Sequence, residues 1–285
     1  MILVLGATGR IGGAASAHLA NNHIDHRVLV RDGKKFSPSP GAQIDVVVGD
    51  LGNDGDVRKA LEGVNSALLV LANSAKQPAM ERQFATAAAD AGVQHLVKVS
   101  SIEAGPDTSA AFPRSHFETE QHIRSLDIGW TFLRPSFFMQ NLLTYAGSIA
   151  SAGLFALPLG QAKTALVDAR DVGTAAAITL TDPVHRNRGY ALTGPELITF
   201  DQVAETLSET LDKPVRYLPQ SAQEFREKLS MFVKDTWQLN GVCELFGEIA
   251  GGALEEQSDD LDALLGRSAA SLQQFIAEHR QAFNP

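Results

Sequence analysis

The sequence has a single cysteine, Cys243, among 285 residues. One cysteine excludes a disulfide within the chain and a zinc site built from several cysteines. Long apolar runs are also missing: stretches such as residues 67–72 are far shorter than the roughly 20 residues that a membrane-spanning helix needs. A strand is expected to begin at residue 2, which leaves no room for a signal peptide. These absences predict a cytoplasmic protein without a membrane segment.

Positive charge is scarce as well. Lys and Arg number 24 against 33 Asp and Glu, so the formal net charge is -9. Nucleic acid and anionic membranes repel a chain of this charge, and we expect neither as a partner. Hydrophobic residues make up 44% and charged residues 20% of the chain. These proportions are typical of a globular protein with a large core.

What the chain does have is a glycine motif at its start. Residues 2–5 form a short apolar run that predicts a buried strand, and Gly6, Gly9 and Gly12 follow at intervals of three. A helix through about residue 20 should come next. A strand, a glycine turn and a helix gather free N–H groups and the positive end of a helix dipole, where a pyrophosphate fits. The alternative is an ordinary loop, but a second expected strand at the right distance favours dinucleotide binding.

The segment after the second expected strand indicates which dinucleotide is bound. Arg31 lies 19 positions after Gly12. An acidic residue at this place normally binds the ribose hydroxyls of NAD, whereas an arginine pairs with the 2′-phosphate of NADP. Lys35 adds positive charge nearby. We therefore predict NADP(H) as the preferred cofactor, with NAD(H) still possible because Asp32 is adjacent; a solvated basic loop is the alternative interpretation.

Further apolar runs alternate with helical segments along the first half of the chain. They lie at residues 44–48, 66–71, 94–99 and 130–133. This alternation predicts an α/β fold, a Rossmann-type doubly wound parallel sheet. We expect residues 1–135 to form an NADP-binding domain, and residues 136–285 to complete the sheet and form a smaller, mainly helical substrate-binding lobe. Ligands of such sheets bind at the carboxyl ends of the strands.

Helix-capping patterns are frequent in the rest of the chain. Ser/Thr-x-x-Glu/Gln patterns that begin at Ser115, Thr199 and Ser221 predict that helices start there. We interpret Asp171 as the N-cap of a helix over residues 172–180. A last helix is expected over residues 271–283. The acidic residues 255–262 are expected to be solvated surface.

Three segments together with the glycine motif resemble one family. They are residues 99–101, the helix with His116 and Glu120, and residues 133–141. They resemble the NmrA-like branch of the atypical short-chain dehydrogenases/reductases, and within it the quinone, triphenylmethane-dye and azo-dye reductases. The chain departs from the common short-chain reductases, because no tyrosine is followed by a lysine at the fourth position after it. The usual pair that protonates a substrate carbonyl is therefore missing.

The motif and the resemblance together give a set of candidate site residues. The candidates for cofactor binding are Gly6, Thr8, Gly9, Arg10, Ile11, Gly12, Arg31, Lys35, Asp50, Leu51, Ala72, Asn73, Ser100, Pro135 and Phe137. The resemblance places Phe138 and Asn141 at the substrate pocket, and Ser101, His116 and Tyr145 near the reacting atoms. Each has a plainer alternative: Asp50 as a helix cap, the phenylalanines as core, and His116 as a locally bonded helix residue.

Two functions fit these observations. The first is a reductase in which NADPH gives hydride to a small aromatic or quinonoid acceptor, such as a quinone, an azo dye or a triphenylmethane dye. The second is a redox sensor that binds NADP(H) without catalysis and acts through a protein partner. We favour the reductase; an epimerase or dehydratase is disfavoured by the missing tyrosine. No metal site is expected, and a homodimer is possible.

Overall fold

The computed structural model describes residues 1–284. Its central feature is a seven-stranded sheet in the order β3-β2-β1-β4-β5-β6-β9, with every neighbouring pair parallel. The strands are β1 (Ile2–Leu5), β2 (His26–Val30), β3 (Ile44–Val48), β4 (Ser66–Leu69), β5 (His95–Val99), β6 (Gly129–Pro135) and β9 (Arg188–Leu192). The order reverses direction at β1, which is the signature of a doubly wound fold. The predicted Rossmann-type sheet is confirmed.

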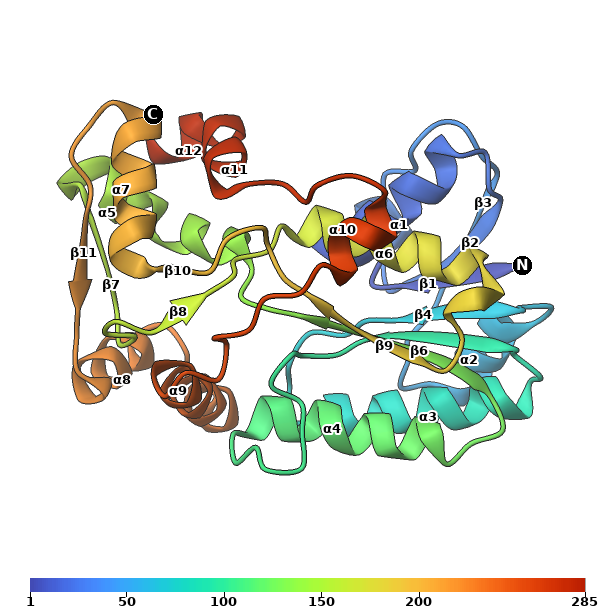
Figure 1. The fold of residues 1–285 in the computed structure, drawn as a ribbon. Coiled ribbons are helices and arrows are strands. Elements are labelled where there is room, and N and C mark those ends of the chain that lie inside the picture. The colour runs from blue at the N-terminus through green and yellow to red at the C-terminus, as the bar shows by residue number, and fades with distance from the viewer. Residues whose placement is uncertain (285) are drawn as a thin grey trace.

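Helices cover both faces of this sheet (Figure 1). On one face lie α1 (Arg10–Asn21), α6 (Ala169–Thr181) and α10 (Asp260–Leu265). On the other lie α2 (Asp54–Leu61), α3 (Gln77–Asp90) and α4 (Ala111–Arg124). The central strands β4 and β5 are buried on both faces, as parallel sheets require, whereas the edge strands β3 and β9 keep exposed residues. The second half of the chain therefore contributes β9, α6 and α10 to the sheet and its layers.

The remaining elements form a lobe beyond the carboxyl ends of the strands (Figure 1). Its helices are α5 (Ala146–Ala152), α7 (Phe200–Leu211), α8 (Ala222–Ser230), α9 (Thr236–Ala250), α11 (Leu272–Glu278) and α12 (Arg280–Phe283). Its strands are β7 (Leu154–Leu157) and β11 (Arg216–Pro219), which pair in parallel, and β8 (Lys163–Thr164) and β10 (Ile198–Thr199), which pair antiparallel. An aromatic cluster of Phe155, Phe200 and Tyr217 lies in its core.

Two of the capping patterns mark helix starts as predicted. Thr199 and Ser221 each form a complete capping box, with α7 and α8 following directly. In α7 the buried side chains recur with helical spacing, because one stripe of the helix faces the lobe core. They are Phe200, Val203, Ala204, Leu207 and Leu211.

Other local predictions were wrong. Ser115 lies inside α4, which begins at Ala111, and its hydroxyl donates to the Ala111 carbonyl at 2.7 Å. A Ser-x-x-Glu pattern also fits a helix interior, where serine can bond back to the preceding turn. Asp171 is not an N-cap: Asp168 caps α6, and Asp171 lies in its first turn. The terminal helix is divided at His279 into α11 and α12.

The acidic stretch 255–262 is also more than solvated surface. The Asp260 carboxylate accepts a hydrogen bond from the backbone N–H of Ala191 at 2.9 Å, and that of Asp262 accepts from Ala269 at 2.7 Å. Leu261 between them is fully buried. The stretch therefore attaches α10 to the edge of the sheet. Among the residues described, the structure has no helix of the length and apolarity needed to span a membrane.

Candidate cofactor cleft and acceptor site

A cleft of about 980 Å³ opens at the carboxyl ends of the sheet strands. It brings together most of the predicted cofactor residues. These are Gly6, Thr8, Gly9, Arg10, Ile11, Gly12, Arg31, Asp50, Leu51 and Ala72, joined by the predicted pocket residue Phe138. Lys76, Gln77 and Met80 near the start of α3, and Ala169 of α6, complete its wall and were not predicted. The cleft is large enough for a dinucleotide.

The glycine turn lines this cleft. Gly6 has φ +66, and a Cβ on it would lie 2.9 Å from the Val70 carbonyl oxygen. A Cβ on Gly12 would lie 2.5 Å from the Gly6 carbonyl. Helix α1 starts after Gly9 with no side-chain cap and no acidic residue in its first turn. Its positive end is thus open to an anion, and the turn fits the pyrophosphate of a dinucleotide.

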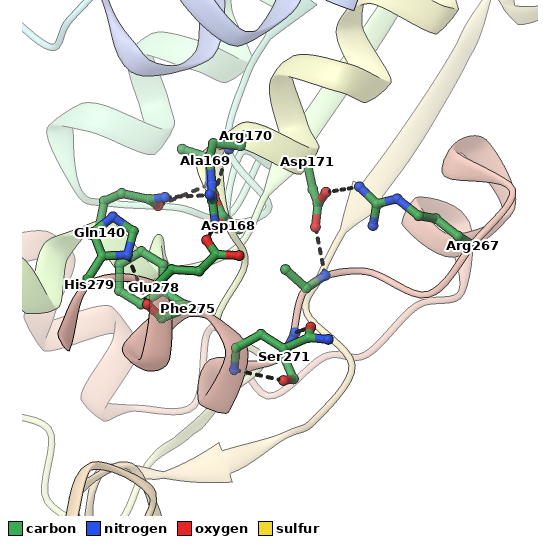
Figure 2. Close-up of polar contacts among 12 residues, drawn as sticks. Gln140, Asp168, Ala169, Arg170, Asp171, Arg267, Ser271, Phe275, Glu278 and His279 are labelled. Carbon is green, nitrogen blue, oxygen red and sulfur yellow. Dashed lines mark hydrogen bonds and ion pairs between the residues drawn. The ribbon is translucent and has the colours of Figure 1, made fainter. Parts of the chain in front are cut away.

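Helix α6 packs against the start of helix α1, next to this turn. At Gly173 a Cβ would lie 2.5 Å from the Ala14 side chain and 2.6 Å from the Ile11 carbonyl oxygen, so the two helices pack as closely as glycine allows. No spacing rule signals that contact, because it joins helices far apart in sequence. The start of α6 is itself fixed by Gln140, whose amide donates to Asp168 at 2.7 Å and accepts from the Ala169 N–H at 3.0 Å (Figure 2).

The C-terminal segment is bonded to the first turn of α6 and to its cap (Figure 2). Arg170 bridges Asp168 and Glu278, each at 2.6 Å. Asp171 binds the Arg267 guanidinium at 2.5 Å and accepts from the Ala270 N–H at 2.7 Å. Burial opposes the ionisation of Asp168, but hydrogen bonds from Arg170 and Gln140 lower its pKa overall. The cleft wall therefore depends on residues near the C-terminus.

The charges around the cleft favour an anionic ligand. Arg10, Arg31 and Lys76 line it, against the single carboxylate of Asp50. Asp32 does not line it, and its side chain accepts the Lys34 N–H at 3.0 Å, which caps the short 3₁₀ helix Gly33–Lys35. Lys35 is exposed in that helix and is not part of the cleft wall. The cleft is thus basic in a chain whose net charge is -9.

The structure bears on the alternative interpretations given above for Asp50, as a helix cap, and for the phenylalanines, as core. The N-cap of α2 is Asn53, so Asp50 does not cap that helix. Phe137 packs edge-on against Phe200 at 5.7 Å between ring centroids and is 7% exposed, in the core of the lobe. Met139 is also core, whereas Phe138 lines the cleft. Asn73, Pro135 and Asn141 are not among the cleft residues.

Polar groups gather where β5 ends. The hydroxyl of Ser100 is buried and has no hydrogen-bond partner among the described residues. Ser101 donates to Glu103, whose pKa is raised by burial. An unpartnered buried hydroxyl costs stability unless a ligand or water satisfies it. The end of β5 therefore carries a buried hydroxyl close to the edge of the sheet at which ligands of this fold bind.

The other two catalytic candidates lie in different surroundings. His116 is 8% exposed and contacts the buried Lys98. Burial, with a further contribution from the Lys98 charge, holds the pKa of His116 well below its usual value. Tyr145 packs against Phe155 in the lobe, and burial raises its pKa to about 12. Both side chains are therefore uncharged at neutral pH.

Helix α9 of the lobe is joined to the start of α4. Helix α4 has no side-chain cap of its own. Instead Glu248 accepts hydrogen bonds from the Thr108 hydroxyl and from the N–H groups of Ser109 and Ala110, each at 2.8 Å. Burial opposes ionisation of Glu248, but these bonds lower its pKa overall. The lobe thus supplies the cap of a helix that packs on the sheet.

The doubly wound sheet, the uncapped glycine turn and the basic cleft define a Rossmann-type protein with a dinucleotide-shaped site. The chain belongs to the NmrA-like family, whose model matches residues 1–276. It is 33% identical to an NAD(P)H azoreductase from Xenophilus azovorans, over 99% of both chains. It is 36% identical to a (4-alkanoyl-5-oxo-2,5-dihydrofuran-3-yl)methyl phosphate reductase from Streptomyces griseus subsp. griseus, over the full length of both.

A solved structure of another reductase matches the fold of this chain. An NADPH-dependent quinone oxidoreductase from Escherichia coli, complexed with NADPH, superimposes with a TM-score of 0.86 at 25% identity. The match covers 98% of this chain and 99% of that chain. The whole chain, including the lobe, therefore has the architecture of that reductase.

Proposed function

We propose that the chain is an NAD(P)H-dependent oxidoreductase that transfers hydride to an electron-poor conjugated acceptor: a quinone, an azo dye or a triphenylmethane dye. The observation that carries this proposal is the basic cleft over an uncapped glycine turn. Relatives named as azo, oxo-dihydrofuran and quinone reductases support it. The bound cofactor supplies the hydride, and the protein supplies alignment and exclusion of water.

NADP(H) is the cofactor that we propose as preferred. Arg31 lines the cleft at the end of β2, while the neighbouring Asp32 is engaged in capping a turn. A guanidinium there pairs with a 2′-phosphate, and the carboxylate that would accept ribose hydroxyls is turned elsewhere. We assign Lys35 a supporting role through its charge. NAD(H) can still be used, because the rest of the cleft does not depend on that phosphate.

We assign the other site residues by their place around the cleft and, where they do not line it, by the membership in the NmrA-like family. The glycine turn with Thr8, Arg10 and Ile11 would hold the pyrophosphate. Asp50 and Leu51 would lie against the adenosine. The nicotinamide would lie toward Ala72, Asn73, Ser100, Pro135 and Phe137, and the acceptor toward Phe138, Asn141, Ser101 and Tyr145. We further propose residues 1–135 as the cofactor-binding domain and residues 136–285 as the segment that completes it and covers the acceptor.

The setting of the enzyme is also a proposal. We propose a cytoplasmic enzyme, with a possible homodimer, whose substrate is a small aromatic molecule. The net charge of -9 supports the absence of a nucleic-acid partner.

Oxidation of NADPH by the purified protein tests the function. It should be followed with a panel of quinones, azo dyes and triphenylmethane dyes, and repeated with NADH. We expect turnover that is faster with NADPH at low cofactor concentration. Tight binding of NADP(H) without turnover across the panel would instead support a redox sensor that acts through a protein partner.

A further inference from the structure

A buried charged network lies between β5 and helices α3 and α4. The Lys98 ammonium donates to Glu81 at 2.7 Å, to the Val99 carbonyl oxygen at 3.3 Å and to Nδ1 of His116 at 3.2 Å. Lys98 is 0% exposed, Glu81 1% and His116 8%. Removing two opposite charges from water costs several kcal/mol per ion, so such a pair gives little net stability. The network therefore calls for a reason other than stability.

We propose that His116 is a catalytic hydrogen-bond donor to the acceptor and that Lys98 is the residue that positions its ring. This role rests on the proposed reductase function. It would replace the tyrosine and lysine that the chain lacks.

The contact with Lys98 fixes the tautomer of His116. An ammonium group has only donors, so Nδ1 of the ring must accept, and Nε2 then carries the hydrogen. The depressed pKa keeps the ring neutral at physiological pH. Nε2 makes no hydrogen bond within the described residues. It is also absent from their buried atoms without a partner, so it keeps some exposed surface. It is therefore a permanent N–H donor with free capacity.

The network reaches the cofactor cleft. Gln77 lines the cleft and donates to Glu81 at 3.2 Å. Ser100 directly follows the last residue of β5, two positions after Lys98. The hydroxyl of Ser100 is buried without a partner. A continuous chain of hydrogen bonds thus runs from Gln77 in the wall of the cleft through Glu81 and Lys98 to His116.

The chemistry of the acceptors makes this role selective. Hydride addition to a quinone or an azo group leaves negative charge on oxygen or nitrogen, which a donor backed by an ammonium group stabilises. Hydride addition to a triphenylmethane cation occurs at carbon and neutralises a positive charge. No anion develops in that reaction. The Lys98–His116 pair should therefore assist quinones and azo dyes, and give little help to triphenylmethane dyes.

The test compares the two classes of acceptor in three variants. His116→Leu removes the donor, His116→Gln keeps an N–H of similar reach, and His122→Leu on the same helix is the matched control. His122 bonds to Thr86 at 2.9 Å, outside this network. Removing one such donor costs roughly 10²-fold in kcat. We expect that loss for quinones and azo dyes in His116→Leu, a smaller loss in His116→Gln, and nearly unchanged reduction of triphenylmethane dyes in all three variants.

Equal losses for quinones and triphenylmethane dyes would show a structural role and overturn the proposal. An unchanged quinone kcat in His116→Leu would overturn it as well. If the wild-type protein reduced no acceptor at all, the reductase function itself would fail. Lys98→Met combined with Glu81→Gln avoids a lone buried charge and should lower only quinone and azo reduction. A ¹⁵N NMR spectrum of the wild-type protein should show the Nε2–H tautomer of His116; the Nδ1–H tautomer would refute the positioning role of Lys98.

Discussion

The cofactor cleft and the region around β5, α4 and α9 are built in different ways. The turn that lines the cleft is formed by backbone, at Gly6, Gly9 and Gly12. The second region is formed by side chains that come from distant parts of the chain, such as Glu248 on Ala110 and His116 on Lys98. Backbone sites tolerate side-chain changes outside the turn, whereas side-chain networks fail when a single member is removed.

This difference separates recognition of the cofactor from selection of the acceptor. A glycine turn with an open helix end recognises a pyrophosphate that all nicotinamide dinucleotides share. We expect the choice between acceptors to come from the residues beyond β5, where the sheet and the lobe meet. The following variants separate the two regions.

The largest effect is expected for Gly12→Ala. The added Cβ would lie 2.5 Å from the backbone of Gly6, and that backbone cannot move without opening the turn. Overpacking of this kind costs up to about 3 kcal/mol of stability. If opening the turn relieves the clash, restoring the turn on binding costs a similar amount, and NADPH should bind up to roughly hundredfold more weakly. Calorimetry of NADPH binding measures it. Gly247→Ala is the control, since nothing lies within 4 Å of its Cβ, and unchanged NADPH binding in Gly12→Ala would contradict the backbone account.

A smaller, selective effect is expected for Arg31→Gln. Hydrogen bonds to charged groups contribute about 1.5 kcal/mol or more, so NADPH should bind roughly tenfold more weakly while NADH binding stays the same. The two dissociation constants are compared with those of Arg58→Gln, an exposed arginine on α2 outside the cleft. Equal weakening of both cofactors would mean that Arg31 does not contact the 2′-phosphate.

Glu248→Gln tests the second region through stability. Loss of a helix cap costs about 1 kcal/mol, and chemical denaturation should show that decrease. The pKa of Glu248 is lowered in the folded protein, so its contribution is present above the ordinary carboxyl pKa and is lost as the pH falls through the lowered value. The variant and the wild type should therefore converge in stability at acid pH. Glu209→Gln, an exposed change on α7, should be neutral at every pH.

The smallest effect is expected for Lys35→Gln. Lys35 is exposed and does not line the cleft, so its charge acts through solvent. Exposed charge pairs contribute about 0.5 kcal/mol, which predicts roughly twofold weaker NADPH binding, and less at high salt. A tenfold loss at low and high salt alike would show direct contact with the phosphate instead.

Local rules accounted for the first region well. The strands up to β6, the glycine turn and the place of Arg31 all follow from short-range patterns, and so do the capping boxes of Thr199 and Ser221. The same rules misplaced the start of α4 at Ser115, because the true cap is supplied by Glu248, which bonds Ala110 across 138 residues.

Long-range packing accounts for the rest. Gly173 gives no sequence signal of its contact with α1. A lysine inside an otherwise apolar strand was a signal for Lys98, but its partners Glu81 and His116 lie on two helices. Which of three adjacent side chains faces the cleft also depends on packing: Phe138 does, while Phe137 and Met139 are core.

The most direct test of the central claim is to follow the hydride itself. NADPH deuterated at the transferring position of the nicotinamide is mixed with the protein and a triphenylmethane dye, and the colourless product is examined by mass spectrometry. The proposed function predicts deuterium on the central carbon of the product, because hydrogen there does not exchange with water. Tight NADPH binding with no labelled dye product and no reduction of any other acceptor would contradict it.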